Sequence, residues 1–349
     1  MVDQVFPNIF RMEIPLPGNP LKAINSYVIK GDGRFLIIDT GMKREECREV
    51  LEAGIQELAV DLERTDFFIT HLHADHLGLV SELARGSSKV YFNAPDAKII
   101  NDPDHWDKII ANALANGFPE EEINSAMLKH PGRRYQTRDP LNFTLLQEGD
   151  RVSIGAYDLQ CVSTPGHTRG HLCLYEPRTK IFFSGDHILE DITPNISMWA
   201  ENENPLQQYL ESLDKITPFD IRWVFPGHRR AFTHCRRRIE ELKHHHAVRA
   251  DEARSILKKG RQSAYQVASQ MTWDISCKRW EDFPVPQKWF ASGEALSHLQ
   301  YLQGKNKVRQ EKENGKIYYS LTLVQSKLPP TLSVALKSGK TSDNVLRLA

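Results

Sequence analysis

A short stretch of the chain, residues 67–83, contains the side chains best suited to bind metal ions. It holds three histidines and one aspartate: His71, His73, Asp75 and His76. Burying several imidazoles and a carboxylate is unfavourable unless they share a partner, and a divalent cation is the simplest partner. Imidazole suits zinc, iron or nickel, and the carboxylate makes the ligand set harder. A solvated loop with unrelated histidines is the alternative, and this density of ligands disfavours it.

The spacing of these residues indicates two metal ions. His71 and His73 lie two positions apart in an extended loop, so both side chains can converge on one ion. Asp75 and His76 are adjacent at the expected start of a helix, and their side chains diverge toward a second point. The four residues together favour a dinuclear site.

The flanking residues predict a strand, a loop and a helix. Phe67, Phe68 and Ile69 form a short apolar run typical of a buried strand. After His76, apolar residues recur at roughly helical spacing. The ligands would then lie at the carboxyl end of a strand, where α/β folds place their sites.

The pattern His-x-His-x-Asp-His resembles the signature of the metallo-β-lactamase superfamily. The family pattern also has four single residues elsewhere, each after a strand, and the chain has a match for each. They are Asp39 in Leu-Ile-Ile-Asp-Thr-Gly, His167 in Thr-Pro-Gly-His-Thr-Arg-Gly-His, Asp186 in Phe-Ser-Gly-Asp-His and His228 in Phe-Pro-Gly-His. The resemblance covers residues 1 to about 240.

The resemblance implies a ligand set and a mechanism. His71, His73 and His167 would bind one metal ion, and a second ligand group with a bridging carboxylate would complete the site: Asp75, His76, His228 and the bridging Asp186. Zinc is the first choice for both ions, with iron or manganese as alternatives. A hydroxide held between the ions would attack an electrophilic carbon or phosphorus. Asp75 could take up its proton, and Asp39 would orient ligands from behind them.

The order of strand and helix patterns predicts an α/β fold. Strand and helix patterns occur twice with similar content in residues 1–240, as expected for an αββα sandwich of the metallo-β-lactamase type. Apolar residues at helical spacing predict a helical insertion over residues 95–140. A place over the metal ions and a scaffold role are equally expected for it. Residues 241–324 predict helices and then a hairpin, an order that resembles a winged helix, and residues 325–349 are expected to be a loose tail.

The composition of the chain indicates in which cellular compartment the protein is expected. The 349 residues contain 45 basic and 45 acidic side chains, so the net charge identifies no partner. The cysteines form no Cys-x-x-Cys pair, which favours a reducing compartment. The N-terminus does not resemble a signal peptide, and no apolar stretch approaches the roughly 20 residues needed to cross a bilayer. We therefore expect a cytoplasmic protein without a membrane anchor.

The charge distribution of the C-terminal region indicates whether the protein is expected to bind nucleic acid. Residues 241–349 carry 18 basic and 10 acidic side chains. The candidate recognition helix, residues 286–303, nevertheless has no lysine or arginine between Trp289 and Gln303. We therefore do not expect specific nucleic acid binding, and we expect the domain to pack against the catalytic half or a second subunit of a homodimer.

The favoured function is a metal-dependent hydrolase of a small acyl substrate, meaning a thioester, lactone or ester. The segment around His167 is similar to that of hydroxyacylglutathione hydrolases (glyoxalase II), although no glutathione-binding motif is visible. The alternatives are a metal-dependent, endoribonuclease-like nuclease and a DNA-binding regulator with a sensing hydrolase domain. The roles of His171 and His187 stay open. Three consecutive histidines, His244 to His246, cannot chelate one ion from a helix, so a solvated face is expected there.

Overall fold

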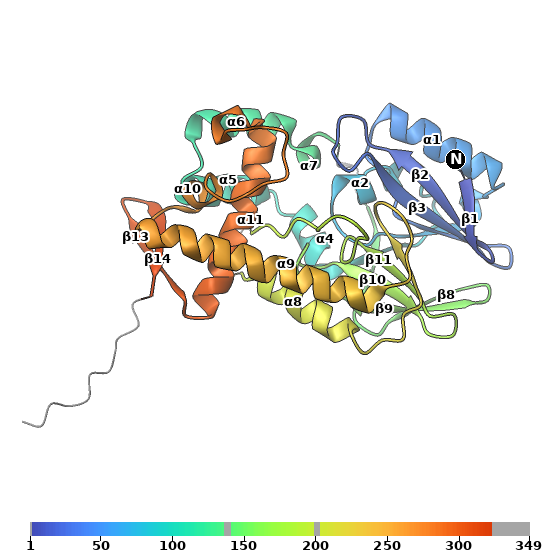
Figure 1. Cartoon of the computed structure of the whole chain (residues 1–349). Helices are drawn as coiled ribbons and strands as arrows, with labels where there is room; N and C mark the ends of the chain where they lie inside the picture. The colour runs from blue at the N-terminus through green and yellow to red at the C-terminus, as the bar shows by residue number, and fades with distance from the viewer. Residues whose placement is uncertain (1, 136–140, 199–202, 323–349) are drawn as a thin grey trace, which may run out of the picture.

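The computed structural model of the protein describes residues 2–135, 141–198 and 203–322. Its first sheet has seven strands in the order of the chain (Figure 1). They are β1 (Val2–Phe6), β2 (Ile9–Pro15), β3 (Ala23–Lys30), β4 (Phe35–Ile38), β5 (Thr65–Phe68), β6 (Val90–Asn93) and β7 (Phe143–Leu146). The first four strands pair antiparallel and the last four pair parallel. Strand β1 lies at one edge of this sheet and β7 at the other.

The second sheet has five strands in the order β12-β11-β10-β9-β8. Their bounds are β8 (Arg151–Ile154), β9 (Tyr157–Ser163), β10 (Leu172–Glu176), β11 (Ile181–Gly185) and β12 (Trp223–Pro226). Strands β11 and β12 pair parallel, and the other neighbours in this sheet pair antiparallel. Because parallel neighbours end at the same edge, the residues that follow β11 and β12 come close together.

The two sheets pack face to face between layers of helix, which confirms the mixed α/β fold. Apolar side chains of both inner faces form one core, including Phe68 from the first sheet and Phe183 from the second. Three helices cover the outer face of the first sheet: α1 (Glu45–Glu57), α2 (Ala74–Leu77) and α3 (Val80–Leu83). Two helices cover the outer face of the second: α8 (Pro205–Ile216) and the first half of α9 (Cys235–Ile256).

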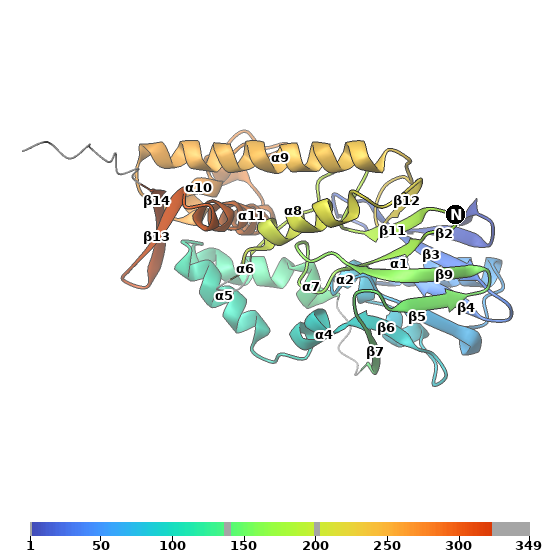
Figure 2. The ribbon, with the colours of Figure 1, turned by 90° about the horizontal axis from the view of Figure 1, so that it is seen from below.

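The expected insertion is helical, with α4 (Ala94–Ile100), α5 (His105–Ala115), α6 (Glu120–Lys129) and α7 (Pro131–Arg134). Its residues 136–140 lie outside the described residues. Phe118, between α5 and α6, is buried against Trp289 of the C-terminal region, with ring centroids 5.2 Å apart. Lys288 and Glu122 form an ion pair of 2.8 Å across the same contact. Figure 2 shows α11 between α9 and the insertion, and at Phe118 the insertion packs against α11.

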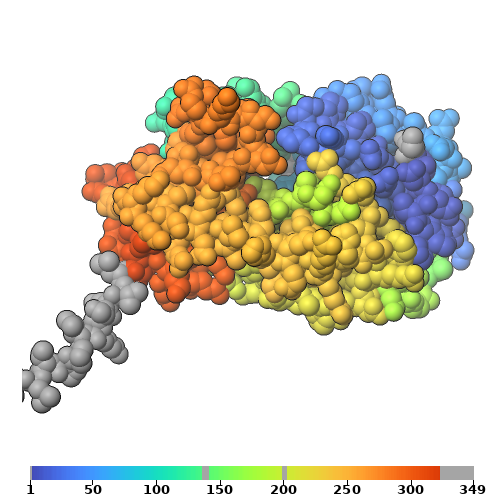
Figure 3. Space-filling model, in the orientation of Figure 1, coloured from blue at the N-terminus to red at the C-terminus, as the bar shows by residue number. Residues whose placement is uncertain are grey.

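The C-terminal region consists of helices followed by a hairpin. Its elements are the second half of α9, α10 (Ala264–Ala268), α11 (Val285–Gly304), β13 (Val308–Glu313) and β14 (Lys316–Leu321). The boundary expected at residue 240 falls within α9, which runs across both parts of the molecule (Figure 3). The tail expected over 325–349 lies outside the described residues. Within the described chain, no helix is both long and apolar enough to span a membrane.

The histidines of α9 differ from the expectation of a solvated face. His244 is exposed, but His246 is buried, and its Nδ1 lies 3.3 Å from Nε2 of His298 in α11. The expectation was wrong at His246 because α11 packs against α9 on that side. Only the tertiary contact reveals this, since the local sequence is strongly polar.

Candidate metal centre

Two strands of the first sheet bring Asp39 and the ligand loop together. Strands β4 and β5 are parallel, with Ile38 opposite Phe68, so the residues after each strand lie side by side. Asp39 adopts a left-handed backbone conformation with φ of 59°. Its carboxylate accepts hydrogen bonds of 2.9 Å from both the backbone N–H and the hydroxyl of Thr70. These bonds fix the start of the loop that carries His71, His73, Asp75 and His76.

The second sheet supplies the remaining ligands from its facing edge. His167 lies in the loop between β9 and β10, Asp186 follows β11, and His228 follows β12. Gly227 allows the last two loops to approach the first sheet. A Cβ atom there would lie 2.6 Å from Oδ1 of Asp186 and 2.9 Å from Cε1 of His76. Glycine is therefore required for the close packing of backbone and ligands at this point.

The structure brings all seven predicted ligands together. In the first group, Nδ1 of His73 lies 3.0 Å from Nε2 of His71 and 3.0 Å from Nε2 of His167. The potential ligand atoms of this group lie within 4.8 Å of one another, as do those of two further groups: Asp75, His76 and His228, and His71, His76 and Asp186. The groups share residues, so they form one continuous centre.

Asp186 lies between the two sets of histidines. Its Oδ2 is 3.5 Å from Nε2 of His167 and 3.4 Å from Nε2 of His228, and its Oδ1 is 3.5 Å from Nε2 of His76. One carboxylate therefore faces ligands of both predicted ions. Asp75 reaches the second set only, with Oδ2 3.4 Å from Nε2 of His228.

Hydrogen bonds on the far side of three imidazoles determine which nitrogen faces the centre. Nδ1 of His76 donates to Asp39 at 2.7 Å. Nδ1 of His228 donates to the carbonyl of Ala23 at 2.7 Å, and Nδ1 of His167 donates to the carbonyl of Asn195 at 2.9 Å. Carbonyl oxygens can only accept, so Nδ1 of His228 and of His167 keeps its proton, and Nε2 is the nitrogen that can offer a lone pair inward when the ring is neutral.

Charge differs across the centre. Burial, together with the neighbouring imidazoles, lowers the pKa of His73 to about 3 and the pKa of His71 well below its ordinary value. Burial also disfavours charge on His228, but the carboxylates of Asp186 and Asp75 outweigh it and raise the pKa to about 10. Burial likewise opposes charge on Asp75, yet its histidine neighbours lower its pKa to about 2. One side is therefore neutral and the other is a cluster of opposite charges.

The donor set fits divalent metal ions. Within the part of the chain that the structure describes, three buried atoms at the centre lack a hydrogen-bond partner: Nε2 of His76, Nε2 of His228 and Oδ1 of Asp186. Unpartnered polar atoms are unfavourable in an interior, and here all three belong to the ligand groups. Imidazole nitrogen and carboxylate oxygen are common zinc ligands.

Asp96 is a site residue that the sequence did not reveal. Its buried carboxylate accepts hydrogen bonds from the N–H of Leu72 at 3.0 Å, the hydroxyl of Thr168 at 2.8 Å and the N–H of Gly170 at 2.8 Å. Leu72 lies between two ligands and Thr168 follows a third. Asp96 therefore joins the two ligand loops, although in sequence it looks like an ordinary residue near a helix start.

His171 and His187 have positions that separate them from the ligands. His171 donates from Nδ1 to the hydroxyl of Thr164 at 2.8 Å, and its Nε2 accepts from the N–H of Asp186 at 3.1 Å. One nitrogen therefore supports the Asp186 loop and the other is bonded to Thr164, which follows β9. The buried ring of His187 packs against Tyr209 of α8, with ring centroids 5.3 Å apart.

Comparisons of sequence and structure point to one family. The sequence model of the Metallo-beta-lactamase superfamily matches residues 20–228, a range that ends at the last predicted ligand. A metallo-beta-lactamase family protein from Thermus thermophilus has a TM-score of 0.77 and 26% identity, and the match covers 91% of this chain and 100% of that one. A beta-lactamase domain protein from Burkholderia ambifaria has a TM-score of 0.78 at 26% identity, with 92% and 94% covered. The likeness therefore extends into the C-terminal region.

Named relatives include hydrolases of thioesters. "Probable metallo-hydrolase YqjP" of Bacillus subtilis is 24% identical over 84% of this chain and 92% of its own length. "Acyl-coenzyme A thioesterase MBLAC2" of Homo sapiens is 25% identical over 60% of this chain and 74% of its own. "Atrochrysone carboxyl ACP thioesterase" of Aspergillus fumigatus is 24% identical over 69% of this chain, and the match spans 62% of that longer protein.

Proposed function

The chain belongs to the metallo-beta-lactamase superfamily of hydrolases, and we propose that it cleaves a small acyl substrate, a thioester, lactone or ester, with two divalent metal ions. The observation that carries this proposal is the position of Asp186 between two ligand groups. Thioesterase names among the relatives favour a carbonyl carbon over phosphorus as the centre attacked. A thioester is the first substrate class to test.

The proposed metal ligands divide as the ligand groups do. His71, His73 and His167 would hold one ion, while the second would be held by a different group: Asp75, His76 and His228, with Asp186 shared between both. Zinc fits this set of nitrogens and oxygens, and iron or manganese would accept the same donors. When bound, two such ions supply Lewis acidity at the carbonyl and lower the pKa of a water molecule toward neutrality.

The side chains have separate roles in this proposal. Asp75 has a pKa of about 2, because histidine neighbours outweigh the effect of burial, so it is ionised at neutral pH, as a metal ligand must be. In this proposal the same carboxylate takes up the proton of the attacking water. Asp39 is almost fully buried behind His76, so it orients that ligand through the 2.7 Å bond to Nδ1. Thr70, which donates to Asp39, holds the carboxylate in place.

Charge pairing in the C-terminal region argues against the nuclease and regulator alternatives. We propose that its helices and hairpin, in winged-helix order, serve as a packing module. Ten residues of α11 are buried, so this helix does not present the exposed face that a DNA groove requires. Arg261 pairs with Glu313, and Arg309 lies 3.2 Å from Glu311. Such pairing offsets part of the positive charge that binding to phosphates would require.

We propose a cytoplasmic location as part of the same interpretation. All five cysteines are free thiols and four of them are buried. Buried free thiols are typical of proteins in reducing compartments. A thioester substrate would suit that setting, because carrier thiols occur there.

A substrate panel tests the proposal directly. Metal-reconstituted protein should be assayed against acyl-coenzyme A and glutathione thioesters, lactones, a phosphodiester and single-stranded RNA. We expect thioester hydrolysis that a chelator abolishes and added metal restores. Asp186→Asn should abolish it, and Cys161→Ser, a buried site away from the ligands, should not. Cleavage of the phosphodiester or RNA alone would refute the acyl proposal.

A titration with nucleic acid tests the packing role of the C-terminal region. We expect no binding of duplex DNA at physiological salt, and no change on Lys307→Glu with Arg309→Glu. Sub-micromolar binding that persists at physiological salt and is lost in this double variant would favour the nuclease or regulator function instead.

A further inference from the structure

One metal ligand is held by a segment that crosses to the C-terminal helices. Nδ1 of His167 donates to the carbonyl oxygen of Asn195 at 2.9 Å. Asn195 lies between β11 and α8, in irregular chain with no secondary structure of its own to fix it. The orientation of the imidazole therefore depends on what holds this segment in place.

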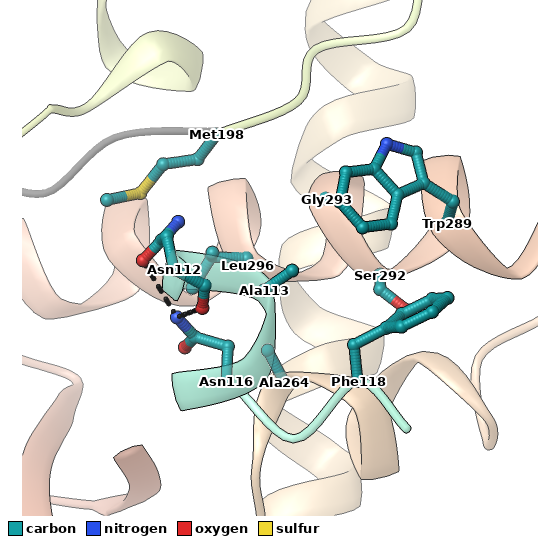
Figure 4. Close-up of a pocket in the computed structure, with 10 residues that line it drawn as sticks. All are labelled: Asn112, Ala113, Asn116, Phe118, Met198, Ala264, Trp289, Ser292, Gly293 and Leu296. Carbon is teal, nitrogen blue, oxygen red and sulfur yellow. Dashed lines mark hydrogen bonds between the residues drawn. The ribbon is translucent and has the colours of Figure 1, made fainter. Parts of the chain in front are cut away.

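Helix α11 holds the segment at two points. The side-chain amide of Asn195 donates to Oε2 of Glu294 at 3.3 Å. Three residues along, the N–H of Met198 donates to the carbonyl of Gly293 at 3.2 Å. Figure 4 shows Met198 and Gly293 lining a small cavity where this segment, α5 and α11 meet. The contact to Glu294 is the one nearest to the ligand.

Glu294 is itself held by the C-terminal region. Nε of Arg249 in α9 lies 3.5 Å from its Oε1. Arg249 also donates to Glu252 and to the carbonyl of Thr272, each at 2.6 Å, and its guanidinium lies over the Trp273 ring at 4.3 Å. A planar guanidinium with several partners has little freedom, so it presents a fixed charge to Glu294.

Glu294 is an isolated, mostly buried carboxylate in a part of α11 that is otherwise almost free of charge. Between Trp289 and Gln303, α11 contains no other acidic or basic residue apart from His298. The side chain is only 14% exposed. A carboxylate in such a place is unfavourable unless it is paired and hydrogen-bonded, and Arg249 and Asn195 provide those partners.

We propose that Glu294 is a positioning residue for the metal ligand His167. It acts through Asn195: the carboxylate holds the Asn195 amide, the Asn195 carbonyl accepts from Nδ1 of His167, and Nε2 then faces the ligand group. The C-terminal region thereby completes the first metal site. This inference rests on the proposed metal centre and assigns part of its geometry to a helix outside the matched family range.

Metal affinity tests the inference without reference to turnover. Co²⁺ can be titrated into chelator-treated wild type, Glu294→Ala, Glu294→Gln and Asn195→Ala, with absorption bands reporting the coordination of each equivalent. Glu122→Ala is the matched control, because it removes a carboxylate that pairs with α11 at Lys288 and not at Glu294. We expect the affinity for one of two equivalents to fall about 10–100-fold in both alanine variants, with its absorption band altered.

Two further results complete the expectation. Glu294→Gln, which keeps an acceptor for the Asn195 amide, should recover most of the affinity. The double variant Glu294→Ala with Asn195→Ala should lose no more than Asn195→Ala alone, since both act through one contact.

Equal Co²⁺ binding by wild type and Glu294→Ala would overturn the inference, as would the same loss in Glu122→Ala. Asn195→Ala removes only an amide on irregular chain, so it keeps the test decisive if Glu294→Ala fails to fold. Wild-type protein that binds no Co²⁺ would refute the proposed function itself, a result that is distinct from the failure of this inference.

Discussion

Replacing Asp96 with asparagine tests how the two ligand loops are held. The substitution keeps the shape of the side chain but leaves one acceptor oxygen for three donors, at Leu72, Thr168 and Gly170. The threonine hydroxyl can rotate and accept instead, but a backbone N–H cannot. One buried N–H therefore loses its partner, which destabilises the folded protein by about 1–3 kcal/mol.

The same substitution also removes a buried charge, and this second effect stabilises the folded protein. Burial raises the pKa of Asp96 from 3.8 to about 6, even though its hydrogen bonds oppose the rise. This difference corresponds to about 3 kcal/mol that disfavours the ionised form in the folded protein. At about pH 7.5 the two effects nearly offset. We expect the metal-free Asp96→Asn variant to differ from wild type by less than about 2 kcal/mol.

The pH dependence separates the two effects. The folded protein holds the Asp96 proton more tightly than the unfolded chain, so the stability contributed by protonated Asp96 is complete below about pH 4 and is lost by about pH 6. Asparagine does not titrate, so the variant does not lose this contribution to its stability as the pH rises. The unfolding free energy of the variant should therefore rise relative to wild type by roughly 2–3 kcal/mol over this window.

Urea denaturation of both chelator-treated proteins at several pH values measures this difference. Titration of the metal ligands is common to both proteins and cancels in the comparison. Metal affinity should fall in the variant by about 10–100-fold, because Leu72 and Thr168 adjoin ligands. A stability difference that is constant from about pH 4 to pH 6.5 would refute the reasoning about burial.

Three other substitutions or conditions give separate tests. Asp186→Ala should lower the occupancy of both metal sites in elemental analysis, while Cys161→Ser should leave two ions per chain. Metal binding should release protons and strengthen as pH rises toward 10, because Asp186 and Asp75 raise the pKa of His228 to about 10 despite its burial; calorimetry in buffers of different ionisation enthalpy measures the protons. Phe118→Ala should reduce stability by about 3–5 kcal/mol in denaturation, with metal content unchanged.

The candidate ligands that the structure brings together could be named from sequence because each follows a strand and belongs to a short, chemically distinctive motif. His71 and His73 need only local geometry to converge, and the motif around His167 predicts a turn. The apolar strands were predictable for a related reason, since buried strands are continuous apolar runs. Edge strand β1 (Val2–Phe6) contains Asp3 and Gln4 and lacks that signal. Prediction from sequence therefore succeeds for elements whose signal is local, such as a short ligand motif or an apolar run.

Apart from Asp39, the supports of the candidate ligands could not be predicted, because they depend on contacts between distant segments. Asp96 and Gly170 are 74 positions apart, and Asn195 and Glu294 are 99 apart. Nothing near Asp96 in sequence distinguishes it from a helix-capping residue. The burial of His246 and the packing of Phe118 on Trp289 likewise require α11 to be in place.

The position of α11 connects these separate findings. A helix that only closed the C-terminal core would need apolar residues alone, yet α11 also carries Glu294 toward the segment behind His167 and His298 toward α9. The same helix packs against the insertion through Trp289. The ligand loops are thus held from two directions, by Asp96 in α4 and by α11 of the C-terminal region. Changes far from the metal ligands should therefore alter metal affinity when they move α11, and should not do so when they leave it in place.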